Sequence, residues 1–324
     1  MLCNCAKALL QPVLVNTSKT PFRKYTARRA LMYVPASDDK KVAKAFGTNA
    51  DCITLDCEDG VALNKKVQAR LNIRELLEKG KPARKRRYEL VVRVNSIASG
   101  FIKDDLRVIL TAPHLPDSIY LPKVEQIDQL KIFSDYLNEY IKKNPKLGLI
   151  IGIESAVALI NVVDICKEAV KMSETSKFQP AALVFGSDDY CASIGARRSE
   201  SSSEITYARQ KVISVARAFN LQAIDMVYIK YQDLKGLKKQ AEEGARWGFT
   251  GKQIIHPGQI DVTQEAFSPT SAEIEWASGV LKAFHKHQKD GEGAFAYKGN
   301  MIDMPTMKQA QNIMDLSNAI MIEK

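Results

Sequence analysis

Short apolar runs alternate with longer amphipathic stretches along most of the 324-residue chain. The apolar runs have few polar interruptions, which is typical of parallel strands buried on both faces. The stretches between most of them repeat apolar residues every three or four positions, which indicates helices. We predict strands at 30–34, 52–56, 90–94, 118–121, 149–153, 182–185, 223–228 and 252–255, and helices at 64–77, 127–142, 157–171, 204–219 and 232–246. Eight strands alternating with helices predict an α/β fold, the (β/α)8 TIM barrel.

The pattern changes after Pro257. A helical stretch at 271–288 leads into a glycine-containing segment at 289–300, and a last helical stretch ends near residue 320. Two helices joined by a glycine-hinged loop are typical of a lid. We therefore predict a barrel domain at 29–262 and a C-terminal helical lid extension at 263–324 that carries Asp303.

The charge is distributed unevenly. The formal net charge is +10, but the first acid is Asp38, and six basic residues precede it: Lys7, Lys19, Arg23, Lys24, Arg28 and Arg29. An acid-free basic leader with Ser, Thr and apolar patches is typical of a mitochondrial transit peptide. We expect one at 1–28, and hence a location in the mitochondrial matrix; a disordered leader is the alternative. Only +4 remains from residue 31 onward, so nucleic acid is not an expected partner.

Composition disfavours two further classes. No apolar stretch approaches the roughly 20 residues that span a bilayer, so no membrane partner is expected. The six cysteines show neither zinc-site spacing nor the pattern of a disulfide framework. Buried, reduced thiols are the plain interpretation.

Polar side chains lie at the end of every predicted strand. They are Tyr33; Asp56, Glu58 and Asp59; Arg93 and Asn95; Lys123 and Glu125; Glu154; Asp188 and Asp189; Asp225; and His256. The carboxyl ends of barrel strands meet at one face, where TIM-barrel enzymes place their chemistry. Glu154 and Asp189 each follow a long apolar run, and one or two carboxylates are what Mg²⁺ takes from a protein. The pattern suggests a Mg²⁺ site, with structural carboxylates or helix caps as the alternative.

Several motifs occur in a fixed order. They are LMYVP at 31–35, LDCEDGVA at 55–62, VRVN at 92–95, LPKVE at 121–125, IESA at 153–156, FGSDDY at 185–190, YAR at 207–209, QAID at 222–225 and GKQIIHP at 251–257. On these motifs the chain, from about Arg29 to its C-terminus, resembles the citrate lyase β-subunit-like family.

The resemblance implies a carbon–carbon lyase that uses Mg²⁺ and CoA thioesters. The reaction it implies is retro-Claisen cleavage of (3S)-citramalyl-CoA to pyruvate and acetyl-CoA, with synthase side activity on glyoxylate. Three alternatives stay open: a malyl-CoA lyase or thioesterase, an aldolase that releases pyruvate from a free acid, and a non-catalytic basic barrel that binds RNA or serves as a scaffold. The last predicts salt-sensitive nucleic-acid binding without metal dependence.

The resemblance also assigns roles to residues. It implies that Glu154 and Asp189 bind Mg²⁺ and that Arg93 stabilises the acetyl-CoA enolate. For Arg93, a structural ion pair with Glu58 or Asp59 is the alternative. It further implies a group that contacts substrate or CoA: Tyr33, Lys40, Lys44, Arg93, Ile255 and His256. For Lys40 and Lys44, a solvated basic helix face is the alternative, and for His256 a hydrogen-bonded structural role. Many relatives have Glu where this chain has Asp188, so Asp188 receives no metal role.

Asp303 lies among apolar residues in the predicted lid. An apolar surround would raise its pKa and suit a general acid/base. The resemblance implies that this aspartate acts in the site of a neighbouring subunit, in a homotrimer. The alternative is a cap for the last helix, because Pro305 follows two residues later.

Overall fold

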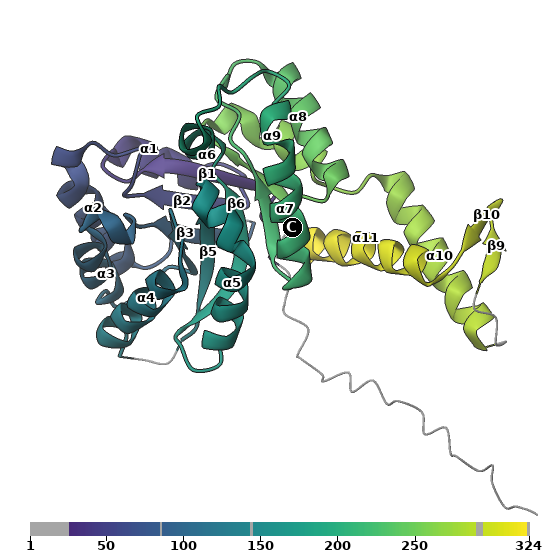
Figure 1. Ribbon diagram of the computed structural model, residues 1–324, viewed down its shortest axis with the longest axis horizontal. Coiled ribbons are helices and arrows are strands. Elements are labelled where there is room, and N and C mark those ends of the chain that lie inside the picture. The colour runs from purple at the N-terminus through teal and green to yellow at the C-terminus, as the bar shows by residue number, and fades with distance from the viewer. Residues whose placement is uncertain (1–25, 85, 143–144, 290–293, 323–324) are drawn as a thin grey trace, which may run out of the picture.

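The computed structural model describes residues 26–322 except 85, 143–144 and 290–293. Its centre is a closed barrel of eight parallel strands surrounded by helices (Figure 1), which confirms the predicted TIM barrel. The strands are β1 (Ala30–Pro35), β2 (Cys52–Asp56), β3 (Glu89–Arg93), β4 (Ser118–Leu121), β5 (Leu147–Ile153), β6 (Phe178–Phe185), β7 (Gln222–Asp225) and β8 (Gly251–Ile254). They pair in chain order, and β1 closes the barrel against β8.

Helices and short 3₁₀ turns connect the strands. The barrel helices are α1 (Asp39–Phe46), α2 (Lys66–Lys79), α3 (Ile102–Leu110), α4 (Ile127–Tyr140), α5 (Ala156–Met172), α6 (Ser187–Ile194), α7 (Thr206–Ala218), α8 (Leu234–Trp247) and α9 (Ile260–Ala266). The 3₁₀ turns are Leu63–Lys65, Ile97–Ser99, Ser203–Ile205 and Pro257–Gln259. The five predicted helices are present. The shorter α1, α3, α6 and α9 carry too few turns for a clear periodic signal.

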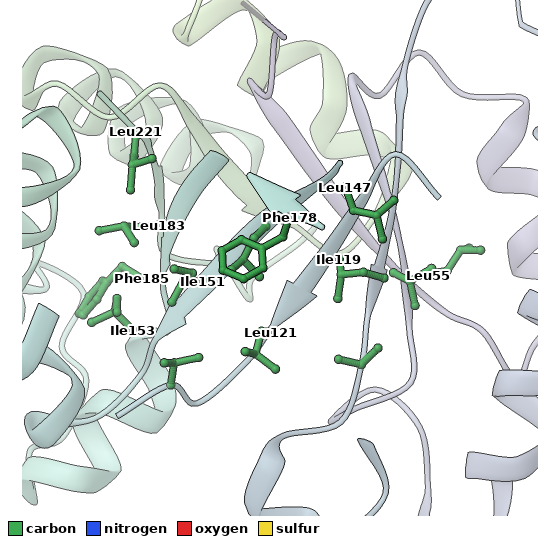
Figure 2. Packing of buried hydrophobic residues seen from close by; sticks show 14 of the residues in the cluster. Leu55, Ile119, Leu121, Leu147, Ile151, Ile153, Phe178, Leu183, Phe185 and Leu221 are labelled. Atoms are coloured by element: carbon green, nitrogen blue, oxygen red, sulfur yellow. The ribbon is translucent and has the colours of Figure 1, made fainter. Parts of the chain in front are cut away.

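Two apolar layers stabilise the barrel, because successive strand residues point to opposite faces. Outward residues such as Ile151, Ile153 and Phe185 pack under the helices, as Figure 2 shows. A smaller cluster fills the barrel interior: Leu31, Cys52, Val91, Tyr120, Ile150, Ala182, Val184 and Ile224. The four cysteines in the described part of the chain are buried free thiols, as predicted.

The folded barrel begins before residue 29. Arg28, which the prediction assigned to the leader, is 6% exposed and forms a two-point ion pair with Glu89 at the amino end of β3, with distances of 2.5 and 2.7 Å. Of the predicted transit peptide, residues 1–25 lie outside the described residues, and Ala27 is buried like Arg28. At the other end, α9 continues past the predicted boundary at 262 and packs on β1 and β8.

The C-terminal segment extends away from the barrel and then turns back, so that its end lies beside the barrel again (Figure 1): Ala319 and the barrel residue Gln222 line the same cavity. It consists of α10 (Ser271–Lys289), the antiparallel strands β9 (Phe295–Tyr297) and β10 (Asn300–Ile302), and α11 (Met304–Ile322). The hairpin was not predicted; its two-residue turn, Lys298-Gly299, has φ values of 48° and 83°, as a type I′ turn requires. A separate apolar cluster that includes Val280, Phe284, Phe295 and Ile302 holds this arm together. Within the described residues, we find no helix with the length and apolarity needed to cross a membrane.

Asp225 does not reach the barrel mouth, contrary to the prediction. It is the last residue of β7, points outward and is fully buried against α7, where Arg209 binds both carboxylate oxygens at 3.0 and 2.8 Å. Lys252 lies 3.4 Å from the same carboxylate. Burial lowers the pKa of Lys252 to about 8. Asp225 therefore serves as the counter-ion of two buried cations.

Replacing Asp225 by Asn should leave these two cations without a buried partner. We expect the free energy of unfolding to fall by about 3–5 kcal/mol, measured by urea denaturation. Asp128→Asn is the control, since Asp128 pairs with Lys131 on an exposed helix surface, and its midpoint should barely move. Equal shifts in the two variants would contradict the assigned role.

Candidate active site

A cavity of about 590 Å³ opens at the carboxyl end of the barrel strands. Seven of the nine predicted site residues line it: Tyr33, Lys44, Arg93, Glu154, Asp189, Ile255 and His256. Lys40 and Asp303 do not. The predicted convergence of strand ends is thus largely confirmed, and these seven residues come from five strands, β1, β3, β5, β6 and β8, or from the segments that follow them.

Arg93 is held in place before any ligand binds. Asp56, Arg93 and Tyr120 are register partners on β2, β3 and β4, so their side chains share the inner face. Arg93 Nε and Nη2 each donate to Asp56 at 2.7 Å, and Nη1 lies 3.1 Å from Glu58. The guanidinium also lies over the Tyr33 ring, 4.5 Å from its centroid. Asp56, which binds Arg93 at two points, was not predicted as its partner. The predicted ion pair of Arg93 with Glu58 is present.

Tyr33 is fixed by Gln253, a residue that the sequence analysis missed. The Gln253 amide nitrogen donates to the main-chain carbonyls of Phe185 and Asp225, both at 2.9 Å. Its carbonyl oxygen therefore remains to accept from the Tyr33 hydroxyl, at 2.9 Å. Burial raises the pKa of Tyr33, so its phenol stays neutral. Alternation along β8 was the available signal, because it turns Gln253 inward and Lys252 outward.

Glu154 is a buried carboxyl, 4% exposed, at the end of β5. Burial, followed by repulsion from Glu58, raises its pKa to about 8, although Arg93 opposes the shift. The Tyr120 hydroxyl donates to its Oε1 at 2.9 Å. Across the described residues, no lysine or arginine forms a salt bridge with Glu154. A buried acid crowded by other acids is a site where an added cation would be stabilised.

Two glycines leave room for the Glu154 side chain. A Cβ on Gly186 would stand 2.5 Å from Glu154 Cγ, and a Cβ on Gly152 would collide with Glu154 Oε1. Such approaches are shorter than real carbon contacts, so a side chain at either position would displace the carboxylate. The absence of side chains at these two glycines thus lets the Glu154 carboxylate lie at the cavity wall.

Asp188 and Asp189 are adjacent acids in the first turn of α6 that make different contacts. About half of each side chain is exposed. Asp188 pairs with Arg198 at 2.7 Å, which gives it a structural partner. Asp189 lies 3.3 Å from the Lys123 ammonium and lines the cavity.

The possible metal ligands fit Mg²⁺, which needs only one or two carboxylates, better than a metal that takes all its ligands from the protein. No group of three His, Cys, Asp or Glu side chains suited to a metal occurs in the described ranges. Glu154 and Asp189 supply two carboxylates at a cavity wall, which leaves other coordination positions for water or substrate oxygens.

The rim of the cavity differs from the predicted one at α1. Lys41 and Lys44 line it, whereas Lys40 does not. On the neighbouring side of the mouth, after β8, Ile255 is 43% exposed. The backbone N–H of Gly258 donates to His256 Nδ1 at 3.1 Å, which supports the structural interpretation of this histidine.

Two other strand-end residues face away from the cavity. The Asn95 backbone and side-chain amides both donate to Asp105, at 2.9 and 2.6 Å, and tie the end of β3 to α3. Glu125 accepts from the Ser155 hydroxyl at 2.5 Å, at the start of α5. Their polarity serves loop geometry, so the predicted ring of polar residues is less complete than the sequence suggested.

Asp303 lies in the arm, is exposed, and caps α11. The backbone N–H and hydroxyl of Thr306 donate to its Oδ1 at 3.0 and 2.8 Å. These bonds lower its pKa, so the expected increase is wrong for the single chain. The neighbouring Met301 and Met304 are themselves exposed and cannot desolvate the carboxylate. Asp303 thus makes the cap contacts of the alternative interpretation, and its acid/base role stays a prediction.

Gly186→Ala should weaken binding of Mg²⁺, because the new methyl displaces Glu154. We expect at least ~10-fold weaker binding by isothermal titration calorimetry. Gly47→Ala is the matched control, since its Cβ would meet only Lys44 O at 3.4 Å. Unchanged Mg²⁺ affinity in a folded Gly186→Ala protein would remove Glu154 from the proposed ligand set.

Comparisons with known proteins agree with this arrangement. The chain is 46% identical to the mitochondrial citramalyl-CoA lyase of Homo sapiens over 94% of this chain and 89% of that protein. It is 30% identical to citrate lyase subunit beta of Leuconostoc mesenteroides subsp. cremoris over 90% of this chain and 94% of that protein. The structure is similar to that of protein CitE from Mycobacterium tuberculosis in complex with magnesium, acetoacetate and coenzyme A, with a TM-score of 0.69, 26% identity, and coverage of 90% and 98% of the two chains.

The family itself is shown by a match that extends over most of the barrel. Residues 29–257 match the HpcH/HpaI aldolase/citrate lyase family, which confirms the resemblance inferred from the motifs. The chain belongs to the HpcH/HpaI aldolase/citrate lyase family.

Proposed function

We propose that this protein is a Mg²⁺-dependent lyase that cleaves (3S)-citramalyl-CoA to pyruvate and acetyl-CoA. The observation that carries the proposal is the placement of Arg93, already oriented by Asp56, in one cavity with Glu154 and Asp189. The 46% identity to a citramalyl-CoA lyase supports the choice of substrate.

Each half of the reaction has a group in the cavity. Glu154 and Asp189 would hold Mg²⁺ against the hydroxyl and carboxylate of the citramalyl group. When bound, the ion supplies Lewis-acid stabilisation of negative charge on those oxygens. Arg93 uses Nε and one Nη2 hydrogen on Asp56 and faces Glu58 with Nη1, which leaves an N–H group that can donate to the thioester oxygen. That contact strengthens as the thioester becomes an enolate, so it stabilises the transition state more than the substrate.

The charged rim favours a CoA thioester over a free acid. Lys41 and Lys44 lie three apart on α1 and line the cavity. Their ammonium groups can bind CoA phosphates as mobile point charges. A pyruvate-releasing aldolase would have no use for them.

The acid/base is proposed to come from another chain. Asp303 is outside the cavity of its own chain, on an arm that projects from the barrel (Figure 1). In an assembly, such as the homotrimer implied by the family resemblance, the arm would bring Asp303 over a neighbour's cavity. Asp303 would then return a proton to the enolate carbon of acetyl-CoA in the direction of cleavage, and remove it in the direction of condensation, including condensation with glyoxylate.

The location is proposed to be the mitochondrial matrix. The first 37 residues lack acids, and the similar human protein is named as mitochondrial. Residues before the folded barrel would act as the transit peptide.

The first test measures pyruvate from (3S)-citramalyl-CoA. We expect formation with Mg²⁺, loss with EDTA and recovery with excess Mg²⁺. (3S)-Malyl-CoA serves as the parallel substrate. A larger kcat/KM for malyl-CoA would favour the malyl-CoA alternative, and metal-independent or absent pyruvate formation would contradict the proposal.

Asp303→Asn tests the acid/base role. Asparagine caps helices as well as aspartate does, so the arm should stay folded and substrate affinity should change little. Turnover should fall at least ~10²-fold, as loss of a general acid/base typically causes.

Mixing this variant with Arg93→Lys tests the neighbouring-chain arrangement. After subunit exchange, some hybrid sites combine an intact Arg93 with an intact Asp303, so activity should rise above that of either variant alone. No recovery, with exchange verified by labelled subunits, would place Asp303 outside the neighbour's site.

A further inference from the structure

Lys123 follows β4 and reaches the acidic side of the cavity mouth. Its Nζ lies 2.8 Å from Glu58 Oε1, 3.1 Å from Asp59 Oδ1 and 3.3 Å from Asp189 Oδ2. Glu58 and Asp59 follow β2, whereas Asp189 belongs to α6, so one ammonium joins two separate elements. Among the residues that the structure describes, it is the one cation within ion-pair distance of Asp189.

The backbone fixes the direction of this lysine. Its φ of 53° lies in the left-handed region, which residues other than glycine rarely adopt. Neighbouring bonds hold the turn: Gln129 Nε2 donates to Lys123 O at 3.2 Å, and Val124 N donates to Gly152 O at 3.3 Å. Unfavourable backbone conformations persist where the surrounding structure imposes them, often at functional sites. Lys123 is therefore held differently from an ordinary flexible surface lysine.

The Glu58 carboxylate is a neighbour of both proposed metal ligands. It shares the Lys123 ammonium with Asp189, and repulsion from Glu58 contributes to the raised pKa of Glu154. The other acids at the mouth already have partners, since Asp56 is bound by Arg93 and Asp188 by Arg198. Arg93 also lies 3.1 Å from Glu58 and 3.8 Å from Asp59, so Lys123 is the second of two cations that hold these two acids.

We propose that Lys123 keeps Glu58 and Asp59 out of the metal's coordination shell and so sets a preference for Mg²⁺ over Ca²⁺. This inference rests on the proposed function. Mg²⁺ is held by one or two carboxylates together with waters and substrate oxygens, whereas Ca²⁺ takes more oxygen ligands, often from several carboxylates. With Lys123 in place, Glu58 and Asp59 stay paired with it at the two shorter distances, so the metal recruits Glu154 and the more distant Asp189. Without its ammonium, Glu58 is held by Arg93 alone and can turn toward the ion as a third carboxylate, which favours the larger ion.

Calorimetric titration of the full-length protein with Mg²⁺ and Ca²⁺ tests this inference without any assay of turnover. Lys123→Gln should bind Ca²⁺ at least ~10-fold more tightly than the wild type, and the gain for Ca²⁺ should exceed that for Mg²⁺. Lys123→Arg is the matched control, because it retains the charge and should retain the wild-type ratio of the two affinities. Adding Glu58→Gln to Lys123→Gln should abolish most of the gain for Ca²⁺.

An unchanged ratio of affinities in folded Lys123→Gln would overturn the inference. Lys123→Gly provides a second variant should the glutamine protein fail to fold, since glycine adopts a positive φ without strain. A wild-type protein that binds no Mg²⁺, or binds it equally well after Glu154→Gln, would instead contradict the proposed function. The two failures are therefore distinguishable.

Discussion

Repulsion among carboxylates is the constraint on which the candidate site depends. Barrel closure brings the ends of β2, β5 and β6 together, and six acids gather there: Asp56, Glu58, Asp59, Glu154, Asp188 and Asp189. Arg93, Lys123 and Arg198 balance five of them through direct ion pairs. Glu154 receives a neutral tyrosine donor instead, and burial with its acidic neighbours raises its pKa to about 8. Glu154 is thus the one acid of these six whose negative charge an additional cation would neutralise.

The same constraint explains why the cations are rigid. Arg93 donates two hydrogen bonds to Asp56 and stacks on the Tyr33 ring, whose hydroxyl donates to Gln253. Lys123 is aimed by its left-handed backbone. A flexible cation could fold back onto Glu154 and neutralise it, which would remove the reason for a metal to bind. Because these charges are already fixed in position, they need little rearrangement when negative charge develops on the substrate.

Sequence alone predicted the barrel well, because eight apolar runs with few polar interruptions have few other ways to bury both faces. It also placed Tyr33, Arg93, Glu154 and Asp189 correctly near one mouth. It failed where the direction of one side chain decides the role: Asp225 points outward to Arg209, and Asn95 turns to Asp105. Gln253 and Tyr120 were overlooked because they lie inside strands, where a partly apolar pattern hides polar atoms. The hairpin of the arm depends on six residues and one turn, too short a signal for periodicity.

The arm has a cluster of its own, centred on Phe284, Phe295 and Ile302, apart from the two layers of the barrel. Substitutions in distant, separate clusters usually change the free energy of unfolding additively. A substitution in the arm should therefore leave the stability of the barrel unchanged. Catalysis has no such independence if Asp303 must meet a barrel from another chain. Damage confined to the arm would then yield a protein of normal abundance and metal affinity that performs no turnover. Protein level and metal content would then be poor proxies for activity.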